Sequence, residues 1–233
     1  RILIEGGAGT GKTFLAAEIA RRCASNGQKV MFLCYNHNLA NHLKKHIDSE
    51  LVTVDSIHQY MLKFLNNAGK VPKGYVPGMP ITDPWFMDEL LPAFTAVVEK
   101  MKSDDRSDVL IIDEGQDILD LEYISALDCV LKGGLEKGTW RIFYDPNHQS
   151  AIYGSMDSEI VDLLKSYGAA PPRLKINCRN TEPIVIQTKL LTGADIGDET
   201  AGPGPRVETY FYQTQEEVAA YVTSYVNNLL EQR

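Results

Sequence analysis

Short apolar runs alternate with longer amphipathic segments along the first two thirds of the chain. Five runs have the length and unbroken apolar character of buried strands: residues 2–4, 29–35, 51–54, 109–112 and 140–144. Strands buried on both faces read as continuous apolar runs, because helices cover both sides of their sheet. The pattern therefore predicts an α/β domain whose parallel sheet has helices on both faces.

Helix-forming segments fill most of the intervals between these strands. They are residues 14–20, 38–47, 55–65 and 85–101. Asn26-Gly27 provides a stop signal after the first of them, since Gly readily adopts the left-handed conformation that ends a helix. Residues 66–84 are rich in Pro and Gly, and we expect a loop or small insertion there.

A complete G-x-x-x-x-G-K-[ST] pattern follows the first predicted strand. It supplies the candidate nucleotide-binding residues Gly6, Gly7, Ala8, Gly9, Thr10, Gly11, Lys12 and Thr13. A strand that enters such a loop and a helix that leaves it direct backbone N–H groups at a phosphate. Lys12 is then expected to reach the β- and γ-phosphates of ATP, and the Thr13 hydroxyl to bind Mg²⁺. The sequence thus predicts a P-loop NTPase with ATP and Mg²⁺ as cofactors.

An Asp-Glu pair ends the fourth apolar run. In a parallel sheet, Asp113 and Glu114 would emerge at the same edge as the phosphate loop. Asp113 is expected to hold Mg²⁺ through a water, and Glu114 to orient and deprotonate the attacking water. A lone Asp-Glu pair is more often a solvated helix start, but the phosphate loop about 100 residues earlier favours catalysis.

Two further polar segments follow strands. In residues 143–149, an amide after a strand could sense the γ-phosphate, although a Pro-Asn turn is the favoured interpretation of this segment taken alone. In residues 174–180, Arg179 could stabilise charge on the transferred phosphoryl group, whereas an isolated arginine after a strand is usually a surface residue.

Together these segments resemble the superfamily 1 helicases of the UvrD/Rep type. The boxes of that family occur here in order as GGAGTGKT, DEGQD, YDPNHQ and NCR, and residues 33–40 and 53–58 are similar to its segments Ia and Ib. The resemblance implies a helicase or translocase that acts on single-stranded nucleic acid, with DNA favoured over RNA. It assigns ATPase chemistry to Lys12, Thr13, Asp113, Glu114 and Arg179, and coupling to strand binding to Gln116 and Gln149.

The chain departs from the family pattern in its third box. Tyr144 stands where the family has Gly, and one extra residue separates Asp145 from the glutamine. Gln149 is therefore the preferred γ-phosphate sensor, with His148 as the alternative. In segments Ia and Ib, Tyr35 and His58 could stack on bases, while core packing is an equally good interpretation of either.

The resemblance also predicts the domain organisation. Residues 1–172 are expected to form the first RecA-like domain, with a short insertion at about 66–105, and residues 173–233 the incomplete start of a second. In the second part we expect a helix through Leu191, a linker at 202–205, a strand from 207 to 212 and a helix from 215 to 230. Such a fragment of a longer motor should be weakly active or inactive alone, because these motors close two domains around ATP.

Composition limits the partners. The net charge of −8 means that nucleic acid would bind in a local groove, and no apolar run approaches 18 residues, so we expect no membrane partner. The four cysteines are far apart in the sequence and predict reduced thiols in a cytoplasmic protein. The acidic charge also keeps open an alternative function, a P-loop regulatory switch that remodels a protein partner. A degenerate ATP-binding module is disfavoured, because Lys12, Glu114 and Arg179 are all present.

Overall fold

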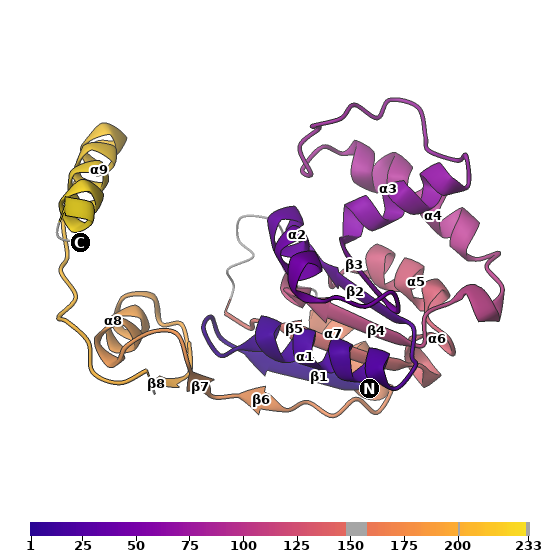
Figure 1. The fold of residues 1–233 in the computed structure, drawn as a ribbon, viewed down its shortest axis with the longest axis horizontal. Helices are drawn as coiled ribbons and strands as arrows, with labels where there is room; N and C mark the ends of the chain where they lie inside the picture. Colours follow the sequence, from indigo (N-terminus) through magenta and orange to yellow (C-terminus); the bar gives the residue numbers. More distant parts are fainter. Residues whose placement is uncertain (148–157, 200, 232–233) are drawn as a thin grey trace.

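The computed structural model describes residues 1–147, 158–199 and 201–231. Its centre is a six-stranded, wholly parallel sheet in the order β3-β2-β4-β5-β1-β6 (Figure 1). The strands are β1 (Ile2–Gly6), β2 (Val30–Cys34), β3 (Val52–Ser56), β4 (Val109–Asp113), β5 (Thr139–Tyr144) and β6 (Arg173–Leu174). The predicted α/β P-loop architecture is therefore confirmed, and β6 carries the sheet two residues past the predicted boundary at 172.

Alternate residues of β1, β2, β4 and β5 enter two separate apolar cores. On β4, Val109 and Ile111 pack with helices α1 (Lys12–Ser25) and α2 (His37–His46) on one face of the sheet. Leu110 and Ile112 join the larger core on the other face. The helices of that face are α3 (Ile57–Asn67), α4 (Leu91–Val98), α5 (Leu121–Val130) and α7 (Ser158–Ser166). This period-two division explains why the strands read as unbroken apolar runs.

The insertion between α3 and β4 differs in detail from its prediction. The expected helix over 85–101 opens as a π-helix, η1 (Phe86–Leu90), continues as α4 and ends at Val98. Pro92 follows this wide turn and has no N–H to donate, so the preceding turn lacks one α-type hydrogen bond. A 3₁₀ turn, η2 (Ser103–Asp105), then leads to β4.

Several helices begin at other residues than predicted or were not predicted at all. Helix α1 begins at Lys12 rather than at residue 14, and α3 begins at Ile57 because Asp55 and Ser56 still pair with β2. The apolar pattern did not predict α5, α7 or the short helix α6 (Gly134–Lys137). A 3₁₀ turn, η3 (Gly115–Asp117), occupies the acidic box after β4.

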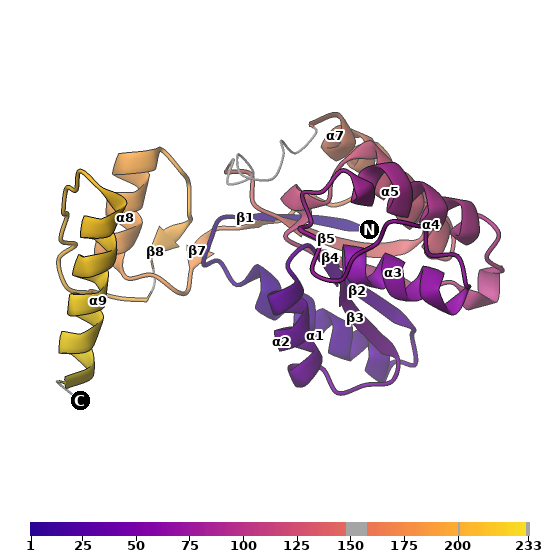
Figure 2. The same ribbon diagram turned by 90° about the horizontal axis from the view of Figure 1, so that it is seen from above.

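The segment after β6 leaves the main sheet (Figures 1 and 2). It contains β7 (Ile176–Asn177), which pairs with β8 (Asp198–Glu199), and the predicted helices α8 (Glu182–Thr192) and α9 (Gln215–Glu231). The predicted strand over 207–212 is wrong, since the structure shows neither helix nor strand there. No described strand lies beside these residues to complete a ladder, and Phe211 is 93% exposed. Within the described ranges, no helix has the length and hydropathy to cross a bilayer.

Candidate functional site

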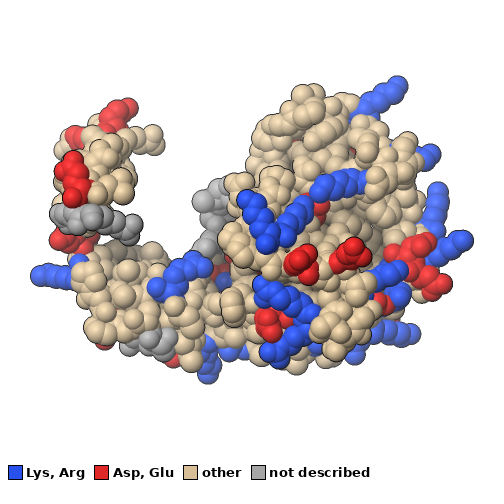
Figure 3. Space-filling view, in the orientation of Figure 1, with Lys and Arg blue, Asp and Glu red and all other residues tan. Residues whose placement is uncertain are grey.

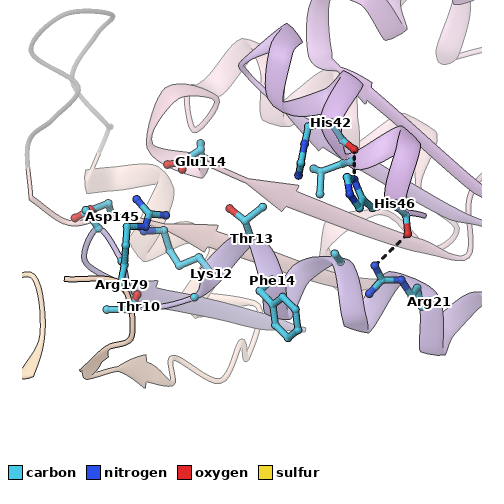
Figure 4. Close-up of a pocket in the computed structure, with 15 residues that line it drawn as sticks. Thr10, Lys12, Thr13, Phe14, Arg21, His42, His46, Glu114, Asp145 and Arg179 are labelled. Atoms are coloured by element: carbon cyan, nitrogen blue, oxygen red, sulfur yellow. Dashed lines mark hydrogen bonds and ion pairs between the residues drawn. The ribbon is translucent and has the colours of Figure 1, made fainter. Parts of the chain in front are cut away.

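A cavity of about 460 Å³ opens at the carboxyl edge of the sheet, where β1, β4 and β5 end (Figure 4). The phosphate loop forms its floor, and Glu114, Asp145 and Arg179 line it together with Lys12 and Thr13. The predicted site residues that line it run from Ala8 to Arg179, 171 positions apart in the sequence. The fold therefore gathers them around one space, as parallel strands with a common carboxyl edge require.

The phosphate loop enters its helix without a side-chain cap. Gly9 and Gly11 both adopt positive φ angles, 87° and 86°, which place the loop backbone in the left-handed region. Gly11 is the N-cap of α1 and has no side chain to accept from the first-turn N–H groups. Those donors, together with the positive end of the helix, suit an anion such as a phosphate.

Lys12 lies buried over its own loop. Its Nζ donates to the carbonyl oxygens of Gly6 at 2.8 Å and Gly7 at 3.2 Å. Asp145 Oδ2 forms an ion pair with the same nitrogen at 3.8 Å. A buried ammonium needs such partners, and phosphate oxygens entering the cavity would supply stronger ones.

Thr13 and Asp113 form a direct pair across the site. Thr13 Oγ1 donates to Asp113 Oδ2 at 2.5 Å, and Asp113 is fully buried. Its second oxygen, Oδ1, has no partner in the described part of the chain. Burial raises the pKa of Asp113 to about 6, and the charge of Glu114 adds to that shift. A buried carboxylate with one free oxygen beside a hydroxyl is a donor set that fits Mg²⁺.

Glu114 is held in an uncommon conformation. It is the single non-glycine residue with positive φ in the described ranges, at 53°. Gln116 Nε2 donates to Glu114 Oε2 at 2.6 Å, and Gln116 Oε1 accepts the backbone N–H of Asp145 at 3.0 Å. Such backbone strain costs about 1–3 kcal/mol and is concentrated at functional sites. The acidic box is thus bonded to the end of β5.

Two residues at the site, Asp145 and Asn177, had no role predicted from the sequence. Asp145 contacts Lys12, and Asn177 of the NCR box lies against the phosphate loop, although neither contact has a sequence signal of its own. Gln149 and the alternative sensor His148 lie outside the described residues. The role of Gln149 therefore stays a prediction.

A second cavity of about 310 Å³ lies at the carboxyl ends of β2 and β3. Tyr35, His58 and Phe86 line it, and the His58 ring lies 5.4 Å from that of Tyr35 and 4.9 Å from that of Phe86. Burial lowers the pKa of His58 to about 4, so its ring is neutral at pH 7. His58 Nε2 lies 2.6 Å from the Tyr123 hydroxyl, while its Nδ1 has no partner among the described residues. His58 thus packs in the core, and base stacking remains a prediction.

Charge is mixed over the face that contains the main cavity. Figure 3 shows Lys and Arg side chains interspersed with Asp and Glu, without a uniformly basic surface. Lys44 and Lys63 converge on the buried carboxylate of Asp55 at the end of β3, at 2.9 and 2.5 Å. Part of the local positive charge is therefore neutralised by the protein itself.

Comparison with known proteins gives a family match and a weak structural likeness. Residues 1–158 match the family described as Schlafen group 3, DNA/RNA helicase domain. Among solved structures, the chain is similar to domain III of the replication initiation protein DnaA from Thermotoga maritima, with a TM-score of 0.37 and 15% identity. The similarity covers 75% of this chain and 54% of that one, so it spans about half of the DnaA structure. No curated protein matches the chain.

Proposed function

The chain belongs to the Schlafen group 3 DNA/RNA helicase domain family, and from this premise we propose that it is the ATP-binding and hydrolysing motor domain of a superfamily 1 helicase or translocase of the UvrD/Rep type. One observation carries the proposal: Lys12, Thr13 and Glu114 line one cavity at the carboxyl edge of the sheet, and Thr13 is hydrogen-bonded to the buried Asp113. The partner we propose is single-stranded nucleic acid, with DNA favoured over RNA. Residues after Leu174 would begin the second motor domain.

The phosphate loop would bind the nucleotide. Its N–H groups would surround the phosphates, and Lys12 would exchange the carbonyls of Gly6 and Gly7 for the β- and γ-phosphate oxygens. Thr13 and Asp113 would hold Mg²⁺ through the Thr13 hydroxyl and the free Asp113 oxygen. The bound ion would neutralise charge on the phosphates.

Glu114 would act as the general base. Its carboxylate lines the same cavity as Lys12, and the hydrogen bond from Gln116 fixes its direction. Arg179 enters the cavity from the segment after β7 and would stabilise charge that develops on the transferred phosphoryl group. Gln116 would link the base to the end of β5, where Gln149 is proposed to sense the γ-phosphate.

The second cavity would receive part of the nucleic-acid strand. Its aromatic lining from Tyr35, Tyr75 and Phe86 suits the planar faces of unpaired bases. Asp117 lines the same cavity, and burial followed by the charge of Glu114 raises its pKa to about 6. The charge of the proposed base therefore reaches the proposed strand site.

The experiment that tests this function is ATP turnover by the full-length protein with and without single-stranded DNA or RNA. We expect stimulation of about tenfold or more by one nucleic acid, which lowers the activation barrier by at least about 1.4 kcal/mol. If neither nucleic acid changes the rate of ATP turnover, the motor function is rejected. The alternative, a P-loop switch that acts on a protein partner, is then favoured.

A further inference from the structure

Asn177, at the end of β7, is fully buried against the outer side of the phosphate loop. Its Nδ2 donates to the carbonyl oxygens of Ala8 at 2.9 Å and Ile196 at 2.8 Å. Its Oδ1 accepts the backbone N–H groups of Arg179 at 3.1 Å and Asn180 at 2.9 Å. One amide thus uses both donor hydrogens and both acceptor positions, and it joins three separate backbone segments.

The contact between the loop and this segment is close. Cys178 N–H donates to the Gly9 carbonyl at 2.9 Å, next to the bond between Asn177 and Ala8. A Cβ atom on Gly9 would lie 2.6 Å from Asn177 Oδ1, and one on Gly7 would lie 2.6 Å from the Asp195 carbonyl oxygen. The glycines therefore give the loop its phosphate-binding shape and also let a second segment pack against its back.

A second set of hydrogen bonds connects Lys12, through Asp145 and Asn147, to Asp195 in the segment after β6. Asn147 exchanges two hydrogen bonds with the backbone of Asp195, both of 2.8 Å. Asn147 also donates to Asp145 Oδ1 through its backbone N–H and its Nδ2, at 2.9 and 2.8 Å. The other oxygen of Asp145 lies 3.8 Å from Lys12 Nζ. The loop is thus tied to the segment after β6 on both sides.

We propose that Asn177 is a positioning residue that couples the phosphate loop to Arg179. Its oxygen fixes the turn from which Arg179 enters the cavity, while its nitrogen follows the position of the Ala8 carbonyl. When phosphates draw the loop N–H groups inward, the Ala8–Gly9 peptide would move and carry the Arg179 turn with it. The arginine would then be aligned when the γ-phosphate is present. This inference rests on the proposed ATP site.

The substitution Asn177→Asp removes the hydrogen bonds that the side chain donates and keeps those that it accepts. An ionised Asp keeps an oxygen for the N–H groups of Arg179 and Asn180, but it cannot donate to the carbonyl oxygens of Ala8 and Ile196. Asn180→Asp is the matched control, because it adds the same charge three residues away at a side chain that is only half-buried. Arg179→Ala provides the reference for complete loss of the arginine.

The measurement is the affinity of each variant for Mg-ADP and for the Mg-bound β,γ-imido analogue of ATP. We expect Asn177→Asp to lower the preference for the analogue over ADP by about fivefold or more, the lower end of typical coupling between sites. ADP affinity should stay within about twofold of the unmodified protein, and Arg179→Ala should remove the preference to the same extent. Adding Asn177→Asp to Arg179→Ala should produce no further loss, because both changes remove one contact.

Three results would overturn the coupling: an unchanged preference in Asn177→Asp, an equal loss in Asn180→Asp, or additive losses in the double variant. Failure of the unmodified protein to bind Mg-ADP would instead reject the nucleotide site itself. If Asn177→Asp does not fold, hydrogen exchange on the unmodified protein provides the test. The amides of Arg179 and Asn180 should change in protection when the ATP analogue binds but not when ADP binds, and unchanged exchange contradicts the proposal.

Discussion

Gln116 holds Glu114 through a 2.6 Å hydrogen bond from its Nε2, while its Oε1 accepts the N–H of Asp145. The acidic box after β4 and the turn after β5 are therefore joined by one largely buried amide. A Cβ atom on Gly115 would lie 2.9 Å from Ile142 Cγ2, so these two segments are also packed tightly. The carboxylate proposed as the base is therefore held in place by neighbouring protein groups.

Gln116→Ala should lower ATP turnover by about tenfold or more with little change in ADP affinity, because it releases the Glu114 carboxylate without touching the phosphate loop. It should also destabilise the protein by about 1–3 kcal/mol, since the buried N–H of Asp145 loses its acceptor. Steady-state turnover, nucleotide titration and thermal unfolding measure the three effects. A loss of stability with unchanged turnover would show that Gln116 only supports the fold.

Glu114→Gln should reduce turnover by about 10²–10⁴-fold, the range that general-base catalysis contributes. Nucleotide affinity should be retained, because the phosphate loop and the Thr13–Asp113 pair are unchanged. Glu122→Gln is the matched control, since it removes the same charge from an exposed position on α5. Equal turnover in the Glu114 variant and the control would exclude Glu114 as the base.

Asp113→Asn should stabilise the Mg²⁺-free protein at pH 7.5. Because the folded-state pKa of Asp113, about 6, lies above its ordinary value of 3.8, the folded form retains a proton that the unfolded form releases between about pH 4 and 6. The free energy of unfolding of the unmodified protein therefore falls across this window, by about 1–3 kcal/mol. Asp113→Asn has no titrating carboxyl group here, so its free energy of unfolding does not fall in this way. The difference in stability between the variant and the unmodified protein should therefore be smaller at pH 5 than at pH 7.5.

Chemical denaturation at pH 5 and 7.5, with and without Mg²⁺, measures this effect. Mg²⁺ with ADP should stabilise the unmodified protein and not the Asp113 variant. Asp108→Asn is an instructive control, because the hydrogen bond from Lys132 lowers the pKa of Asp108. Its contribution to stability is present above pH 4 and lost on acidification, so this variant should be less stable at neutral pH. If both variants were more stable, or both less stable, than the unmodified protein at neutral pH, the opposite pKa shifts of Asp113 and Asp108 would be contradicted.

Gly9→Ala and Gly11→Ala should differ in stability although both glycines have φ near +86°. An alanine at either position destabilises the protein by about 1 kcal/mol, because the backbone there is left-handed. At Gly11 nothing lies within 4 Å of the added carbon, whereas at Gly9 it would lie 2.6 Å from Asn177 Oδ1. Gly9→Ala should therefore lower the midpoint of thermal unfolding clearly more than Gly11→Ala. Equal midpoints would mean that the segment around Asn177 does not pack on the loop in solution.

The sequence identified the strands and the phosphate loop because both depend on local patterns. Apolar runs mark strands buried on two faces, and the spacing of Gly6, Gly11, Lys12 and Thr13 is set by the shape of one loop. The role of Asn177 could not be read in this way, and nor could the hydrogen bonds by which Gln116 joins Glu114 to Asp145. Asn177 bonds to a carbonyl 169 positions earlier, a distance over which no periodicity operates. The strand expected at 207–212 failed because a strand needs a neighbour, which local sequence does not supply.

Tyr35→Ala should weaken binding of a single-stranded oligonucleotide by about 5- to 150-fold, since stacking of one base is worth about 1–3 kcal/mol. Tyr35→Phe keeps the ring that lines the second cavity and should bind within about twofold of the unmodified protein. ADP affinity should be unchanged in both, because Tyr35 does not line the phosphate-loop cavity. Fluorescence anisotropy with labelled DNA and RNA strands of equal length measures the loss and shows which nucleic acid is preferred. If the two variants weaken binding equally, the hydroxyl rather than the ring makes the contact. If neither weakens it, the strand lies elsewhere, and the cavity beside His58 belongs to the core of the insertion.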